Sequence, residues 1–330
     1  MDLEEQTLHL SSKKSKFAIF ISFLLISGIV TLGSAESFSH SRVSKNIDYF
    51  NVRKGQSFNS IIEEFALHPY HKILLKIYIK FNKFDIAQAG YYLSKDQSWK
   101  EFLNSISNGD VIIFKLEIPA GKNLYEIKKI LSESNLLNDC DEFKCLDTSL
   151  KFLEGTLKPD TYFYKHLSSS SAILRQSQND FFELASFLWT KKNPLSPLKD
   201  LSDAIILASI VEKEAGNEEE KPIIAGVFIH RLMIGMKLQA DPTIIYGLLP
   251  NFNGDITKAN ILDKKNPYNT YQIKHLPPTP ISTISQSSLE AVILGVKNDY
   301  LYFVAKGDGT HYFSKTYNEH LEAVKKYQLN

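Results

Sequence analysis

The sequence predicts an α+β protein that carries an N-terminal transmembrane helix, and three observations support this fold class. A run of 19 residues without a charged side chain occupies residues 17–35. A strand–turn–helix pattern then recurs between residues 50 and 131. The C-terminal part, residues 153–330, mixes apolar helical stretches with short strand-like segments. The chain length of 330 residues accommodates about two domains.

The composition supports a folded core and excludes several classes of function. Hydrophobic residues make up 43% of the chain, and the formal net charge is +1. A balanced charge gives no general electrostatic reason to expect a nucleic acid as partner. The sequence contains no P-loop, HExxH or GxGxxG pattern. We therefore expect neither a bound nucleotide nor a metalloprotease zinc, and the sequence predicts no cofactor.

The apolar run at residues 17–35 is long enough to cross most of a hydrocarbon core of about 30 Å. Lys13, Lys14 and Lys16 precede it, so the positive-inside tendency places residues 1–16 in the cytoplasm and the bulk of the chain outside. A cleaved signal peptide is the alternative, but its apolar core is usually only about 7–15 residues. We therefore favour a retained anchor, followed by a polar linker at residues 36–49.

The repeated pattern combines a short extended segment, a turn, a polar N-cap residue and an amphipathic helix. Its copies read NVRKGQSFNSIIEEF (51–65), EIPAGKNLYEIKKIL (117–131) and, more weakly, SKDQSWKEFLNSI (94–106). Gly55, Gly121 and Asp96 occupy the turn, where the backbone is expected to have a positive φ. The region 50–131 resembles LysM domains, which bind N-acetylglucosamine polymers. Two interpretations stay open: a carbohydrate-binding module, or a small α+β module without a ligand.

The two cysteines, Cys140 and Cys145, lie in a connecting loop that we place at residues 132–152. An exported chain favours a short-loop disulfide between them. Two cysteines alone make a poor metal site, because a structural zinc needs four ligands. The four histidines considered as ligands lack ligand spacing, so no metal is predicted; they are His230, His275, His311 and His320.

A helix that is apolar on nearly every side is predicted over residues 201–211, with Ser202 or Asp203 as its cap. Glu212 follows it and lies over apolar residues on a helical wheel, whereas Glu214 points roughly opposite, toward a wetter side. A carboxyl group at the edge of an apolar core retains its proton more easily. Glu212 is therefore a candidate general acid for glycoside cleavage, unless the helix simply ends there in water.

Several long motifs occur in a fixed order along the chain. They are EGTLKPDTYFY, ASIVEKEAG, AGVFIHRLMIGMKLQADPTIIYGL, NPYNTYQIKHLPPTPIS and YLYFVAKGDGTHYFSKTYNEH. Together they resemble the endolytic murein transglycosylases of the MltG (YceG-like) family. The resemblance implies a C-terminal α+β catalytic domain, at residues 153–330, that faces the cell wall from the inner membrane. It implies internal cleavage of nascent peptidoglycan glycan strands, 1,6-anhydro ends and limited strand elongation, with peptidoglycan synthases as further candidate partners.

The same resemblance assigns roles to individual residues. Glu212 falls on the family's catalytic glutamate. The expected substrate-binding residues are Gln239, Asp241, Thr243, Tyr246, Asn269 and Tyr271. Polar members of this set would hold acetamido and hydroxyl groups, and the tyrosines would offer flat faces to sugar rings. The chain departs from the family pattern at His275, which replaces a glycine, and at Thr283-Ile284-Ser285, which replaces Asn-Pro-Gly.

Two other functions compete with the transglycosylase. A hydrolase would use two carboxylates, for example Glu212 with Asp241, at a separation of about 5–9.5 Å. A non-catalytic wall-binding scaffold would leave Glu212 as a surface residue.

Overall fold

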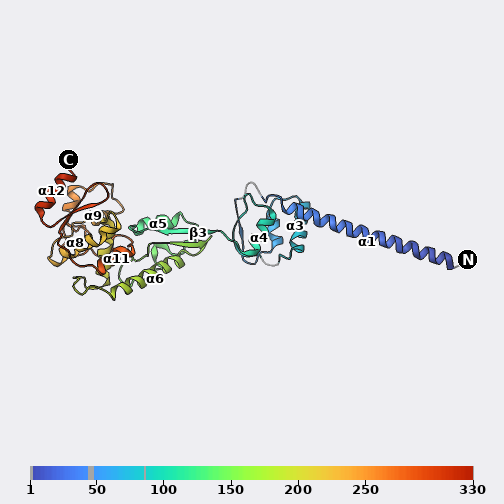
Figure 1. Cartoon of the computed structure of the whole chain (residues 1–330), viewed down its shortest axis with the longest axis horizontal. Coiled ribbons are helices and arrows are strands. Elements are labelled where there is room, and N and C mark those ends of the chain that lie inside the picture. The colour runs from blue at the N-terminus through green and yellow to red at the C-terminus, as the bar shows by residue number, and fades with distance from the viewer. Residues whose placement is uncertain (1–2, 44–47, 85–86, 330) are drawn as a thin grey trace. The chain divides into compact units, whose positions relative to one another are not determined.

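The computed structural model describes residues 3–43, 48–84 and 87–329 (Figure 1). The chain folds into two compact units, Met1–Phe114 and Lys115–Asn330. Helices and short antiparallel strands occur in both, so the α+β class is confirmed. Residues 44–47 of the expected linker, 36–49, lie outside the described residues.

The first unit contains one long N-terminal helix and a small α+β module. Its elements are α1 (Leu3–Ser39), β1 (Tyr49–Val52), α2 (Phe58–Glu64), α3 (Pro69–Phe81), β2 (Gly90–Leu93) and α4 (Trp99–Asn108). Strands β1 and β2 pair antiparallel, with Phe50 opposite Tyr92. Both side chains are buried in the module core beside Trp99 of α4. The helices therefore cover one small sheet through aromatic packing.

Within the described residues, α1 is the single helix that contains a segment long and apolar enough to cross a membrane. This segment is Ser15–Ser39. The helix does not stop where the sequence predicted a linker to begin at Glu36. Ala35 and Ser39 are 1% and 0% exposed because the last two turns of α1 pack into the core of the first unit. The first four residues of the expected linker are thus part of the helix.

The three predicted turns have the expected conformation. Gly55, Asp96 and Gly121 have φ angles of 79°, 60° and 74°. Each turn is followed by a helix whose first amide groups are capped by a polar side chain, which is Ser57, Ser98 or Asn123. The third turn lies in the second unit, so the region 50–131 is divided between the two units at Phe114.

The second unit is built around a helical core. Its elements are β3 (Ile113–Ile118, entering from the first unit), α5 (Leu124–Ser132), β4 (Asp160–Lys165), α6 (Ser170–Trp189), α7 (Leu201–Glu214), α8 (Lys221–Met233), α9 (Asp241–Leu248), α10 (Lys258–Leu262), α11 (Gln286–Ile293), β5 (Tyr302–Ala305), β6 (His311–Ser314) and α12 (Tyr317–Tyr327). Helix α7 packs against α6, α8, α9 and α11. Strands β3 and β4 form one two-stranded sheet, and β5 and β6 form another.

Candidate active site

Helix α7 delivers Glu212 to the edge of the core. Residues 204–211 are all buried, which confirms the helix that is apolar on every side. The N-cap differs from the expectation of Ser202 or Asp203. The side chain of Asp200 accepts a hydrogen bond from the backbone N of Asp203 at 2.9 Å. Asp200 is the cap because Leu201 is already helical.

The carboxyl group of Glu212 is held by two serines. Its Oε2 accepts hydrogen bonds from the backbone N of Ser285 at 3.0 Å and from the Ser285 hydroxyl. The hydroxyl of Ser288 donates to the same oxygen at 2.6 Å. The Glu212 side chain is 9% exposed. This environment differs from the apolar setting that the helical wheel predicted, because a distant loop supplies polar groups.

A buried lysine faces the other oxygen of Glu212. Lys221 Nζ lies 3.5 Å from Glu212 Oε1, and the lysine side chain is 4% exposed. The ammonium group also donates to the hydroxyls of Ser285 at 2.9 Å and Ser287 at 3.0 Å, and it pairs with Glu218. A buried charge persists only when it is paired and hydrogen-bonded. The network therefore fixes the position of the Glu212 carboxyl group.

The loop before α11 brings Ser285 to Glu212. Ile281 N donates to the hydroxyl of Ser209, in α7, at 3.0 Å. On the other side, Thr283 N donates to Lys122 O at 2.8 Å, and Gly121 N donates to Thr283 O at 3.0 Å. The loop is thus bonded both to α7 and to the turn before α5. This placement gives a role to Thr283 and Ser285, which the sequence showed only as departures from the family pattern.

Glu154, in the EGTLKPDTYFY motif, is a second buried carboxyl group, and the residue is 4% exposed. Its Oε2 accepts hydrogen bonds from Tyr246 Oη at 2.9 Å and from Leu124 N at 3.1 Å. Burial outweighs these bonds and raises the pKa of Glu154 to about 7. The residue joins the start of α5 to α9, a role that the sequence analysis missed.

Gly155 allows the Glu154 motif to pack closely against the Ser285 loop. Its φ is +73°, and an added Cβ would lie 2.6 Å from Pro280 Cβ and 3.0 Å from Ser282 O. A side chain therefore cannot be accommodated at Gly155 without displacing the loop. The motif thus supports the loop that holds Glu212.

A groove runs between α5 and α9, and Lys213 is one of its lining residues. It consists of two adjoining cavities of about 510 and 280 Å³ that share Tyr125 and Tyr246. The further lining residues are Asn123, Leu124, Glu126, Lys128, Glu142, Phe143, Leu153, Glu154, Lys213, Pro242, Ile245, Leu249 and Ile281. Lys213 directly follows Glu212 in α7. This α5–α9 groove combines aromatic faces with charged groups, as a carbohydrate site requires.

Glu214 and Asp241 form a separate cluster on the other side of the α7 end. The two glutamates diverge because residues two apart on a helix point in different directions. Glu214 is half-buried, and this burial, together with the nearby Asp241 carboxylate, raises the pKa of Glu214 to about 8. Tyr271 Oη donates to Asp241 Oδ1 at 2.7 Å. The structure thus brings the predicted residues Asp241 and Tyr271 together with Glu214.

Three other predicted substrate residues have different surroundings. Gln239 is exposed, has a φ of +54° and precedes α9. Thr243 is fully buried, and its hydroxyl donates to Ala240 O at 2.6 Å. Asn269 is also fully buried, and its amide donates to backbone oxygens that include Asp263 O at 2.8 Å. In this structure, the polar groups of Thr243 and Asn269 are therefore used inside the fold.

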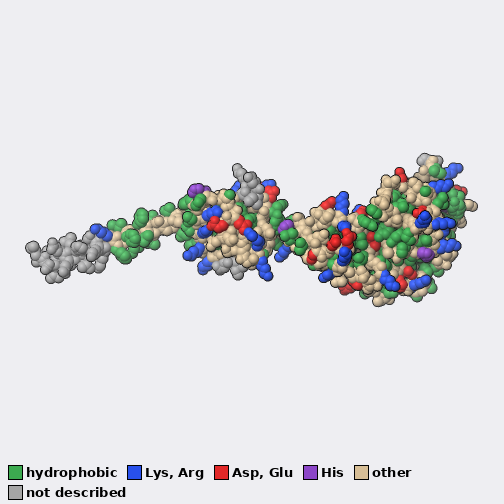
Figure 2. All heavy atoms as spheres, turned by 180° about the vertical axis from the view of Figure 1, so that it is seen from behind, with side chains coloured by type: hydrophobic (Ala, Val, Ile, Leu, Met, Phe, Trp, Pro, Cys, Tyr) green, Lys and Arg blue, Asp and Glu red, His purple; other side chains and the backbone are tan. Residues whose placement is uncertain are grey.

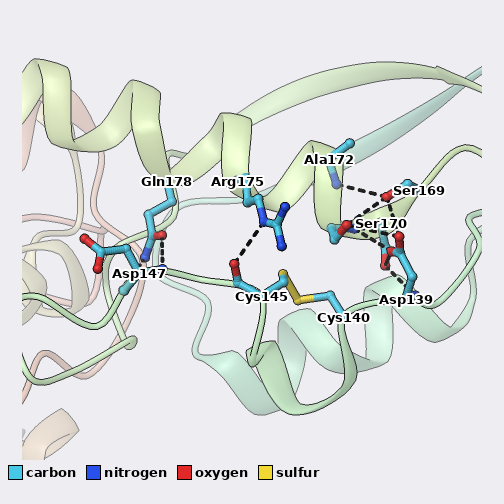
Figure 3. Close-up of a disulfide and its surroundings, with 10 residues drawn as sticks. Asp139, Cys140, Cys145, Asp147, Ser169, Ser170, Ala172, Arg175 and Gln178 are labelled. Atoms are coloured by element: carbon cyan, nitrogen blue, oxygen red, sulfur yellow. Dashed lines mark hydrogen bonds between the residues drawn. A yellow bond between two sulfur atoms is a disulfide. The ribbon is translucent and has the colours of Figure 1, made fainter.

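The disulfide of Cys140 and Cys145 closes a loop beside the N-terminal half of α6 (Figure 3). Asp139 accepts hydrogen bonds from the hydroxyls of Ser169 at 2.6 Å and Ser170 at 3.0 Å, at the start of α6. Arg175 Nε donates to Cys145 O at 3.0 Å. These contacts hold both ends of the loop on α6, and Glu142 and Phe143 within it line the α5–α9 groove.

Within the described residues, no group of three or more His, Cys, Asp or Glu side chains is arranged to hold a metal ion. His311, one of the four histidines considered, pairs with a carboxylate instead. Its Nδ1 and its backbone N each lie 2.7 Å from an oxygen of Glu220. This pair ties strand β6 to the segment that follows α7.

The YceG-like family model matches residues 50–326, so the chain belongs to the YceG-like family. The predicted family is confirmed. The predicted class of enzyme, a lytic transglycosylase, is confirmed with it.

Relatives in this family carry a functional name. The chain is 29% identical over 336 residues to an endolytic murein transglycosylase of Bacillus subtilis (strain 168), covering 92% of this chain and 91% of that protein. An endolytic murein transglycosylase of Streptococcus pneumoniae serotype 2 is 26% identical, over 76% of this chain and 52% of its own length. A crystal structure of a yceG-like protein from Listeria monocytogenes matches with a TM-score of 0.55 and 27% identity, over 83% of this chain and 97% of that chain.

Proposed function

We propose that the protein is a membrane-anchored endolytic peptidoglycan transglycosylase. It cuts the bond between N-acetylmuramic acid and N-acetylglucosamine within nascent glycan strands and so limits their elongation. The observation that carries the proposal is the placement of Glu212, whose carboxyl group is fixed by Ser285, Ser288 and Lys221. The next residue in α7, Lys213, lines a groove with aromatic faces. Relatives named endolytic murein transglycosylases support the same substrate.

One acid/base group is sufficient for this reaction. Glu212 Oε2 is occupied by the serine donors, so we assign proton transfer to Oε1. Glu212 gives its proton to the glycosidic oxygen as the bond to C1 of the muramic acid breaks. The C6 hydroxyl of the same sugar bonds to C1, and its proton returns to Glu212. The products are a 1,6-anhydro end and a new N-acetylglucosamine end, formed without water.

The α5–α9 groove is the proposed glycan site. Tyr125 is exposed and Tyr246 is half-buried, so both rings can face sugar units. Gln239, Asp241 and Tyr271 are retained as candidate substrate contacts on the adjoining surface, and Thr243 and Asn269 act by positioning the backbone around them. We propose that the LysM-like region, residues 50–131, aids glycan engagement without supplying chemistry.

The proposed anchor is a single span with the N-terminus in the cytoplasm and the catalytic unit in the periplasm. The packing of α1 supports retention of the apolar segment. Cleavage after Ala35 would remove the buried Ala35 side chain from the core of the first unit. It would also expose the module surface that the half-buried residues Thr31 and Ser34 cover. N-terminal sequencing of the mature envelope protein tests this, and a chain beginning at Glu36 would contradict it.

Mass analysis of products from uncrosslinked glycan strands tests the reaction. We expect internal fragments that end in 1,6-anhydro-N-acetylmuramic acid. Reducing muramic ends would instead identify a hydrolase that uses two carboxylates. A folded protein that binds glycan without cleaving it would identify a wall-binding scaffold.

A further inference from the structure

One face of α1 packs directly against the α+β module of the first unit. Thr31, Ser34, Ala35, Phe38 and Ser39 lie on one face of α1 and are buried or half-buried against the module. The Phe38 ring stacks on the imidazole of His71, in α3, with centroids 4.3 Å apart. The position of the module along α1 is therefore fixed by packing, and this inference rests on the proposed membrane anchor.

Helix α3 meets α1 inside the apolar run. Tyr70, His71 and Leu74 line a common cavity with Val30 and Gly33, which precede the end of the uncharged run at Ala35. At a rise of 1.5 Å per residue, Val30 lies about 7 Å below Ala35 along the helix. The beginning of α3 thus lies level with the outer boundary of the hydrocarbon core. Figure 1 shows α3 at the end of the first unit from which α1 extends.

The outer face of α3 carries an apolar stripe. Tyr70, Ile73 and Phe81 are 54%, 54% and 67% exposed. With the half-buried Ile77 they fall within an arc of about 80° on the helix, at 100° per residue. The exposed Lys76 and Lys80 lie along one border of this stripe. Figure 2 shows hydrophobic side chains along the coloured part of α1 that extends from the module.

We propose that the α3 stripe, Tyr70, Ile73, Ile77 and Phe81, lies in the outer headgroup layer of the membrane that α1 crosses. Tyrosine with aliphatic residues and flanking lysines is the composition of helices that lie in a membrane interface. The stem of Lys80 extends along the apolar surface while its ammonium group reaches the headgroups. The ammonium group of Lys76 pairs instead with Glu63 at 2.7 Å. The partner of this face is a lipid surface, and its contact holds the first unit against the bilayer.

The test measures depth at single sites in the full chain. Cys140 and Cys145 are joined in the disulfide, so one introduced cysteine can be labelled with an environment-sensitive fluorophore. Ile73→Cys reports on the stripe, and Phe23→Cys reports on the span. Ile113→Cys is the matched control, because Ile113 is the same residue type with 53% exposure and lies at the start of β3. The labelled proteins are placed in phosphatidylethanolamine–phosphatidylglycerol vesicles with spin-labelled headgroups or chains.

We expect headgroup quenchers to quench the Ile73 probe several-fold more than the Ile113 probe. Adding Ile73→Asp to a chain labelled at Phe81→Cys should reduce quenching of the Phe81 probe by a similar factor. Quenching at Phe23 without quenching at Ile73 would overturn the proposal and leave the anchor intact. A spectral shift at Ile73 that depends on protein density, without lipid quenching, would assign the face to a second copy of the chain. Loss of quenching at both Phe23 and Ile73 would overturn the anchor and this proposal together. None of these fluorescence measurements depends on glycan cleavage.

Discussion

Ser285 donates two hydrogen bonds, from its backbone N–H and from its hydroxyl, to the same oxygen of Glu212. The two residues are 73 positions apart in the sequence. The contact leaves the second carboxyl oxygen, Oε1, facing Lys221 at 3.5 Å. A fixed carboxyl group loses little orientational freedom when it acts, which is the basis of catalytic positioning.

Replacing Glu212 should abolish cleavage. Glu212→Gln keeps the size of the side chain but cannot exchange the proton, so turnover should fall by about 10²–10⁴. Glu214→Gln is the matched control on the same helical turn and should lose much less. Both variants are assayed on uncrosslinked glycan, with circular dichroism to confirm folding. An active Glu212→Gln protein would contradict the assignment.

The Ser285 hydroxyl should contribute to the rate through its bond to Glu212. A hydrogen bond to a charged group contributes about 1.5–3 kcal/mol, so Ser285→Ala should lower kcat by about 10–100-fold. Ser287→Ala is the control, because the Ser287 hydroxyl contacts Lys221 and Ser285. Equal losses in the two variants would show that the Glu212 contact has no special effect.

Glu154 should make stability fall as pH rises. Its folded-state pKa is about 7, above the ordinary value of 4.5, so the folded state binds the extra proton between these values. The unfolded state then binds fewer protons, and the free energy of unfolding decreases by up to about 3 kcal/mol as pH rises through this range.

Glu154→Gln should remove this dependence. The melting temperature of the variant, relative to that of wild type at the same pH, should therefore rise between pH 5 and pH 8. Glu126→Gln is the control, because the pKa of Glu126 is lowered by its contacts with Lys122 and Asn123 despite partial burial. Its titration therefore lies below this range. An unchanged pH profile in Glu154→Gln would refute the proposed protonation.

The disulfide should stabilise the loop modestly and take no part in the chemistry. Cys140 and Cys145 are five positions apart, and a loop this short contributes at the low end of the usual range, about 1–2 kcal/mol. Replacing both cysteines with serine should lower the melting temperature while cleavage persists. Thiol labelling of envelope-purified protein, without reductant, should find no reactive cysteine; two labelled thiols would exclude the bond.

A fragment that begins at Lys115 should fold and retain weak cleavage, because it contains the whole second unit. The sequence alone placed the start of the catalytic domain at Leu153. A fragment from Leu153 would lack the Gly121 and Lys122 bonds to Thr283, together with α5. We expect that shorter fragment to melt at lower temperature and to lose activity. A fully stable, fully active fragment from Leu153 would show that these contacts are dispensable.

The sequence by itself determined features that depend on neighbouring residues. The positive φ at Gly55, Asp96 and Gly121, and the polar caps that follow, arise from local backbone sterics and local hydrogen bonds. The apolar helix α7 could also be predicted from the sequence, because its residues 204–211 are apolar on nearly every side and are all buried. The family also follows from motifs in sequence order.

Only the tertiary structure decided what surrounds Glu212. A helical wheel describes one helix, so it predicted an apolar setting and could not show Ser285, Ser288 or Lys221. The two serines reach the carboxyl group because the loop before α11 is bonded to Ser209 and Lys122, which lie far from it in the sequence. Lys221 reaches it from the start of α8. Likewise, the continuation of α1 beyond Ala35 follows from its packing against α3, and polar local sequence indicated a linker instead. Contacts between distant segments set the environment of a side chain, and no local pattern encodes them.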